Sequence, residues 1–175
     1  MSKVLFSLLF VCITVIQTNN QIPWNASRKL SWSDFKGDPD PHSSNAALTS
    51  SNINIEFGYN EEGFKYSIKC SFDQNRSWVR IKTNDVLAHE QGHFDIAEIY
   101  ARKLNKIMKA YRFNAKTAGT DLNKLYEDVM KQHRQTQMQY DQETDYSRNK
   151  PHQEEWLKKI ATDLKGLEAF ANYTH

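Results

Sequence analysis

The residues best suited to chemistry in this sequence are His89, Glu90 and His93, which form the pattern His-Glu-x-x-His. On a helix the two histidines lie one turn apart on the same face, with Cβ atoms about 5–6 Å apart. Imidazoles at that spacing can converge on one cation, and imidazole is a common ligand of Zn²⁺. Glu90 would lie beside the metal rather than on it, where its carboxylate can accept a proton from an attacking water. We therefore expect a zinc site with Glu90 as the catalytic general base.

The flanking sequence favours a central, buried helix over a surface helix that carries these residues by coincidence. Apolar residues recur through the segment, and its charges are confined mostly to the later turns. Asn84 or Asp85 is a suitable N-cap, so the helix is expected to run from there to about Ala110. Gly92 has no side chain, which would let another segment pack close to the metal between its two histidine ligands.

A third ligand is needed, because a catalytic zinc usually has three protein ligands and a water. Residues 140–147, Tyr-Asp-Gln-Glu-Thr-Asp-Tyr-Ser, are rich in oxygen donors and lie well downstream of the helix. The candidates in this segment are Tyr146, Asp141, Glu143 and Asp145. The alternative interpretation is that the segment is only a solvated acidic loop.

Two other residues suit that position less well. His133 continues the apolar stripe of a second helix, where a histidine is more often a packed core residue than a metal ligand. Glu98 lies on the helix of the motif, five residues past His93, and is turned away from the metal face.

Three stretches of the chain also carry a family resemblance. They are residues 32–37 (Trp-Ser-Asp-Phe-Lys-Gly), residues 89–97 (His-Glu-Gln-Gly-His-Phe-Asp-Ile-Ala), and Tyr140-Asp141 to Thr144 followed by Gln153 and Trp156. In these residues the chain resembles a bacterial family that is described as predicted secreted zinc-dependent proteases and catalogued as a domain of unknown function. The resemblance spans nearly all of the chain after its first twenty residues. It implies a zincin-like metallopeptidase that acts on a peptide or protein substrate.

The chain departs from the family pattern at one position. The pattern commonly has the form Tyr-Asp-x-x-Thr-x-His, and Tyr146 stands where the histidine would be. The resemblance thus implies Tyr146 as the third zinc ligand, with Asp141 as the alternative. The departure also motivates a different function, that of a catalytically inactive secreted binding protein on a peptidase-like scaffold. A metal-dependent hydrolase of other bonds would use the same chemistry.

The N-terminus predicts export. After Lys3, an apolar run from Val4 to Ile16 is followed by polar residues, which is the pattern of a secretory signal peptide of about residues 1–20. The run is shorter than the roughly 20 apolar residues of a transmembrane helix, although an uncleaved anchor is the alternative. We expect a secreted or periplasmic protein with no stable membrane association after signal removal. A net charge of +2 is too small to suggest a nucleic-acid partner.

Residues 21–175 are expected to form a single zincin-like domain of the α+β class, with an N-terminal antiparallel sheet followed by a helical part that carries the site. Apolar residues alternate over 53–57 and over 64–72 on either side of a turn, which predicts a hairpin with Cys70 on its buried face. Residues 77–81 are expected to add a third strand, and such a strand above an active-site helix can bind an extended peptide.

Two more helices are expected after the central one. The second begins at Thr120 or Asp121, after a turn that contains Gly119. The third begins near Asn149, Lys150 and Pro151 and presents an apolar stripe of period 3.6 to the core.

Overall fold

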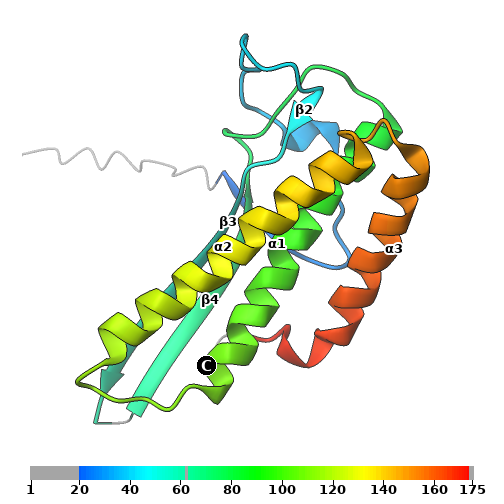
Figure 1. Ribbon diagram of the computed structural model, residues 1–175. Coiled ribbons are helices and arrows are strands. Elements are labelled where there is room, and N and C mark those ends of the chain that lie inside the picture. The colour runs from blue at the N-terminus through cyan, green and yellow to red at the C-terminus, as the bar shows by residue number, and fades with distance from the viewer. Residues whose placement is uncertain (1–19, 62, 174–175) are drawn as a thin grey trace, which may run out of the picture.

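A computed structural model describes residues 20–61 and 63–173 of the chain. An antiparallel sheet is followed by three long helices, α1 (Asn84–Ala110), α2 (Ala118–Thr144) and α3 (Lys150–Gly166), so the expected α+β class is confirmed (Figure 1). The predicted signal peptide lies outside the described residues apart from Asn20. No helix in the described ranges combines the length and apolar character that crossing a membrane requires.

The predicted hairpin is confirmed and forms most of the main sheet. Strands β3 (Ser51–Asn60) and β4 (Gly63–Asp73) pair antiparallel, and β1 (Gln21–Pro23) pairs with the other edge of β4. Alternate residues of β4 face α1 and are buried, as a period of two requires. Cys70 is among them at 3 % exposure, which agrees with its expected role as a small buried hydrophobe.

The expected third strand does not join this sheet. Only β5 (Trp78–Val79) is a strand there, and it pairs with β2 (Ala47–Leu48) in a separate two-stranded sheet. The chain leaves the main sheet in a turn after β4, where the Asp73 carboxylate accepts hydrogen bonds from the amides of Asn75 and Arg76. This turn redirects residues 77–81 toward the N-terminal end of α1.

The starts of α1 and α2 differ from the expected ones by one to three residues, whereas the end of α1 and the start of α3 are as expected. α1 is capped by the Thr83 side chain, which accepts a hydrogen bond from the amide of Val86, and it ends at Ala110 as expected. α2 begins at Ala118 rather than at Thr120 or Asp121. α3 begins at Lys150 with Asn149 as its N-cap, and two short 3₁₀ helices occur at Trp32–Asp34 and Glu168–Phe170.

α1 is the central element, because it contacts the main sheet, α2 and α3 (Figure 1). Its apolar core residues are almost completely buried: Phe94, Ile96, Ala97 and Leu104. The second half of α1 also buries a polar cluster. There the Glu98 carboxylate accepts hydrogen bonds from Arg102 Nε at 2.8 Å and from the Tyr173 hydroxyl at 3.0 Å. The last described residues of the chain are thereby fastened to α1.

Candidate metal centre

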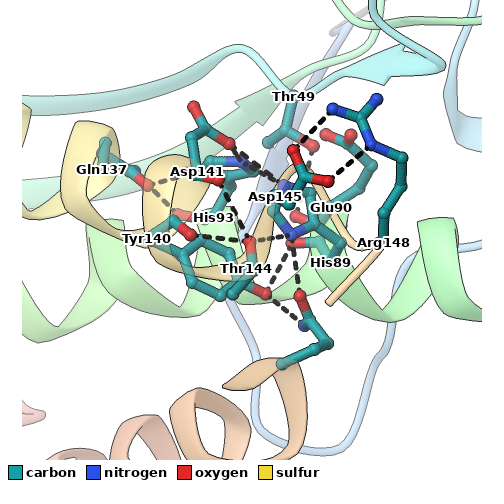
Figure 2. A network of polar contacts seen from close by, with 11 residues as sticks. Thr49, His89, Glu90, His93, Gln137, Tyr140, Asp141, Thr144, Asp145 and Arg148 are labelled. Carbon is teal, nitrogen blue, oxygen red and sulfur yellow. Dashed lines mark hydrogen bonds and ion pairs between the residues drawn. The ribbon is translucent and has the colours of Figure 1, made fainter. Parts of the chain in front are cut away.

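Three potential metal ligands converge where α1 meets α2 (Figure 2). The Nε2 atoms of His89 and His93 are 3.1 Å apart, and Asp141 Oδ1 lies 3.1 Å from the first and 3.0 Å from the second. In a tetrahedral zinc site with bonds of about 2.0–2.1 Å, neighbouring donor atoms are about 3.3 Å apart. The three donors therefore form a triangle close to the size that a zinc ion requires.

The outer nitrogen of each imidazole faces a glutamine. His89 Nδ1 lies 2.9 Å from Oε1 of Gln153 on α3, and His93 Nδ1 lies 2.6 Å from Oε1 of Gln137 on α2. Because an amide oxygen only accepts, both Nδ1 atoms donate, and both Nε2 atoms carry a lone pair. Two such lone pairs and a carboxylate oxygen repel one another unless a cation lies between them. This donor set therefore fits a divalent metal ion.

The charges of the cluster favour a cation beside Asp141, either a proton or a metal ion. Burial alone would raise the pKa of Asp141, but its contacts with His89 and His93 outweigh burial and hold that pKa well below its usual range. Burial alone would lower the pKa of His93, but the Asp141 contact and the charge of Glu90 outweigh it and raise that pKa. Asp141 is thus anionic at neutral pH, as a metal ligand must be.

Glu90 lies beside the cluster and is only 4 % exposed. Its Oε2 atom is the one buried side-chain polar atom in the described part of the chain that has no hydrogen-bond partner. Glu90 and the two histidines line a cleft of about 350 Å³, whose opposite wall is formed by residues 45–51, including β2. Thr49 connects this wall to α1, because its hydroxyl donates to the Glu90 main-chain carbonyl at 3.2 Å.

Gly92 explains how α2 approaches so closely. A Cβ atom at this position would lie 2.3 Å from the hydroxyl oxygen of Tyr140, which occupies the space that the missing side chain leaves. The Tyr140 ring stacks on the His89 ring with centroids 4.5 Å apart. The expectation that another segment packs against Gly92 is therefore confirmed, and that segment is α2.

The structure brings Asp141 into the cluster, whereas Tyr146 stays outside it. α2 continues to Thr144, which places Asp141 on its inner face. Tyr146 follows the end of the helix with a φ of 52°, is 44 % exposed at the rim of the same cleft, and among the described residues forms no hydrogen bond with either histidine.

The other acidic candidates have different partners. Glu143 accepts a hydrogen bond from the indole nitrogen of Trp156 at 2.7 Å, and Asp145 forms an ion pair with Arg148 at 2.7 Å. Glu98 lies away from the cluster, as expected, and pairs with Arg102. His133 is not among the three converging donors; its Nε2 atom lies 2.9 Å from Gln137 Nε2, and burial lowers its pKa to about 4.

The contacts of Gln137 and Gln153 were not anticipated from the sequence. One signal for Gln137 was present, however. His133, Gln137, Asp141 and Thr144 follow one another at intervals of four, four and three residues, which places them on one face of a helix. That face of α2 lies against the His-Glu-x-x-His segment.

Comparisons with known proteins give one positive finding. No curated protein and no solved structure gives a significant match to the chain. The family model described as "Bacterial protein of unknown function (DUF922)" matches residues 15–149, which include all three converging donors and Glu90. Because this match covers well over half of the sequence, the chain belongs to that bacterial family of unknown function.

Proposed function

We propose that this protein is an exported, zinc-dependent metallopeptidase. The observation that supports the proposal best is the state of Glu90, whose Oε2 atom is buried without a partner beside three converging metal donors. A buried, unpaired carboxylate oxygen costs several kcal/mol and is rarely kept without a role. Acceptance of a proton from a water in the cleft is the role that its position suits.

The donor set supports zinc as the metal. Two imidazoles and one carboxylate, with room for a further ligand toward the cleft, are typical of catalytic zinc sites. Zinc held by His89, His93 and Asp141 would supply an activated water near neutral pH and would polarise a carbonyl.

The residues of the chain perform the remaining steps in this proposal. Glu90 takes the proton of the attacking water and later passes it to the leaving amine nitrogen. Asp141 stays anionic and completes the ligand set. Residues 45–51 form one wall of the cleft with small, uncharged side chains and the exposed Leu48, and such a wall suits an extended peptide segment.

The proposal includes an extracytoplasmic location, in agreement with the apolar N-terminal run of residues 4–16. The alternative of an inactive binding protein was motivated by the tyrosine at position 146. Asp141 occupies the place of a third donor, so the departure at Tyr146 does not leave the cluster short of a ligand.

The test is a proteolysis assay on the chain as exported, with an unstructured protein as substrate. Activity is expected to disappear with a chelator and to return with Zn²⁺. Glu90→Gln should lower the rate by about 10²–10⁴-fold while bound zinc stays the same, because the amide cannot accept the proton.

The matched control is Glu98→Gln, which changes another buried glutamate of α1 and should leave the catalytic step intact. Full activity in Glu90→Gln would refute the general-base role. A zinc-loaded wild-type protein that cleaves no unstructured substrate would refute the peptidase and favour the binding protein.

A further inference from the structure

Gln137 and Gln153, which contact the Nδ1 atoms of the two histidines, can each orient their side-chain amide in two ways. A glutamine side chain has nearly the same shape with its oxygen or its nitrogen forward, and only the oxygen can accept from an imidazole N–H. With the nitrogen forward, Nδ1 would have to accept, and the proton would move to Nε2, where it blocks metal binding. Metal-bound histidines are usually oriented by carboxylates or backbone carbonyls, which avoid this ambiguity because they only accept.

At His93 the problem is solved by the main chain. Gln137 Nε2 donates to the His93 carbonyl oxygen at 3.0 Å. A carbonyl only accepts, so the nitrogen of this amide must face it, and the oxygen is left for His93 Nδ1 at 2.6 Å. The same Nε2 group also lies 2.9 Å from Nε2 of His133, which accepts there as a neutral imidazole.

At His89 the same result is reached in one more step. The Tyr140 hydroxyl donates to the His89 carbonyl oxygen at 3.3 Å, which uses its only proton. Its oxygen must then accept from Gln153 Nε2, which lies 2.5 Å away. The oxygen of Gln153 is left to accept from His89 Nδ1 at 2.9 Å.

Thr144 presents a second hydrogen-bond acceptor to His89 Nδ1. Its hydroxyl donates to the Tyr140 carbonyl at 2.6 Å, so toward His89 Nδ1, at 3.5 Å, it can only accept. Every group that faces this Nδ1 atom is therefore an acceptor.

We propose that Gln137 and Gln153 are positioning residues whose amide direction is fixed by the main-chain carbonyl of the histidine that each one orients. Each histidine carbonyl thus determines, through a closed ring of hydrogen bonds, that the Nε2 atom of the same residue presents a lone pair to the metal. The direct ring at His93 uses Gln137 alone, and the longer ring at His89 uses Tyr140 and Gln153. This inference rests on the metal site of the proposed function, but not on peptidase activity.

The first test measures zinc affinity by competition with a chromogenic chelator. Gln137→Met and Gln153→Met remove the acceptor and should each weaken zinc binding by about 10–100-fold. Gln137→Glu and Gln153→Glu keep an acceptor at the same place and should bind zinc at least as tightly as the glutamines. Gln135→Met changes an exposed glutamine of α2 and serves as the matched control, with no expected change.

The second test reads the imidazole tautomers directly in the metal-free protein by ¹⁵N NMR at alkaline pH, where imidazoles are neutral. Both histidines should carry their proton on Nδ1 in the wild type. Tyr140→Phe keeps the aromatic side chain that packs on Gly92 but removes the hydroxyl that links the His89 carbonyl to Gln153. It should give a mixture of tautomers at His89 and leave His93 unchanged.

The two tests separate this inference from the proposed function. Unchanged zinc affinity in both methionine variants, or an unchanged His89 tautomer in Tyr140→Phe, would overturn it. Loss of zinc affinity in the methionine variants supports it whether or not the wild-type protein cleaves a substrate.

Discussion

Two buried glutamates of α1, eight residues apart, are in opposite states. Glu90, at 4 % exposure, has an oxygen without a partner and faces a cleft. Glu98, at 1 % exposure, has both oxygens satisfied, by Arg102 and Tyr173. Burial raises the pKa of Glu98, against the lowering effect of these partners. The same residue type on the same helix therefore has an unpaired oxygen in one half and two hydrogen-bonded oxygens in the other.

The two halves of α1 thus differ in how their buried polar groups are paired. Its first half positions groups whose lone pairs are left available, and its second half uses complete polar pairing to hold the C-terminal segment. A change in the second half should therefore cost stability without affecting metal binding, and a change in the first half should do the reverse.

The largest expected effect on stability comes from Arg102→Leu. This change leaves the Glu98 carboxylate buried without its cation and also removes the hydrogen bond from Arg102 to the Leu164 carbonyl at 2.7 Å. The free energy of unfolding should fall by about 3–5 kcal/mol, as measured by urea denaturation. Zinc affinity at 25 °C should stay within threefold of the wild type. A large loss of zinc affinity in the folded variant would contradict the division of α1.

Zinc itself should produce the next largest effect. At a free concentration 100 times the dissociation constant, zinc should raise the free energy of unfolding by about 2.7 kcal/mol, and a chelator should remove this gain. Measured at the same zinc concentration, Asp141→Asn should lose most of the gain, because it removes the anionic donor. Tyr146→Phe should keep all of it. The reverse result would make Tyr146 the third ligand.

The smallest expected effect concerns His133, at the edge of the cluster. Burial, and then the charges of His93 and Arg134, lower its pKa to about 4 from an ordinary value near 6.5. His133 therefore binds a proton more tightly in the unfolded chain than in the folded one. The stability that neutral His133 contributes is present above pH 6.5 and is lost as the pH falls toward 4. Between pH 7 and pH 5 the protonation of His133 alone should lower the free energy of unfolding by about 2 kcal/mol.

His133→Phe tests this pH dependence, because it keeps a ring of similar size next to Tyr100 but cannot bind a proton. The difference between variant and wild type in urea denaturation at several pH values isolates His133 from the carboxylates. Parallel stability curves for the two proteins would mean that His133 titrates normally in the folded state.

The elements of the fold were predictable because their patterns are local. The period of two in residues 64–72 and the period of 3.6 in the helices correctly predicted which faces are buried. In β3 the same alternation held for Ile53 but not for Phe57, which is 41 % exposed. The N-cap of α1 was missed by one residue because Thr83, Asn84 and Asp85 are all good caps, and only the backbone conformation selects among them. A strand was correctly expected within residues 77–81, but its place in the main sheet was wrong, because the turn after β4 depends on the side chain of Asp73 and leads β5 to pair with β2.

The site was predictable only in part, for a related reason. The spacing of His89 and His93 lies within one helix, so the sequence contains it. The position of Asp141 depends on how far α2 continues and on how it docks, and an acidic segment does not reveal either. Gln137 and Gln153 are neutral residues of a common type. The spacing of Gln137 from Asp141 indicates a shared helix face, but the contacts of both glutamines with the histidines become visible only when three helices are placed together.

The contact between Gly92 and Tyr140 has a consequence for how the site assembles. Asp141 is the next residue after Tyr140, so the seating of this aromatic ring over the glycine also sets the height of the carboxylate above both histidines. The axial position of α2 relative to α1 is thereby set by the contact of Tyr140 with Gly92, independently of any ion. We therefore expect the three donor atoms to be in place before a cation binds. A larger residue at position 92 should displace the Asp141 carboxylate, although it changes none of the three donor residues.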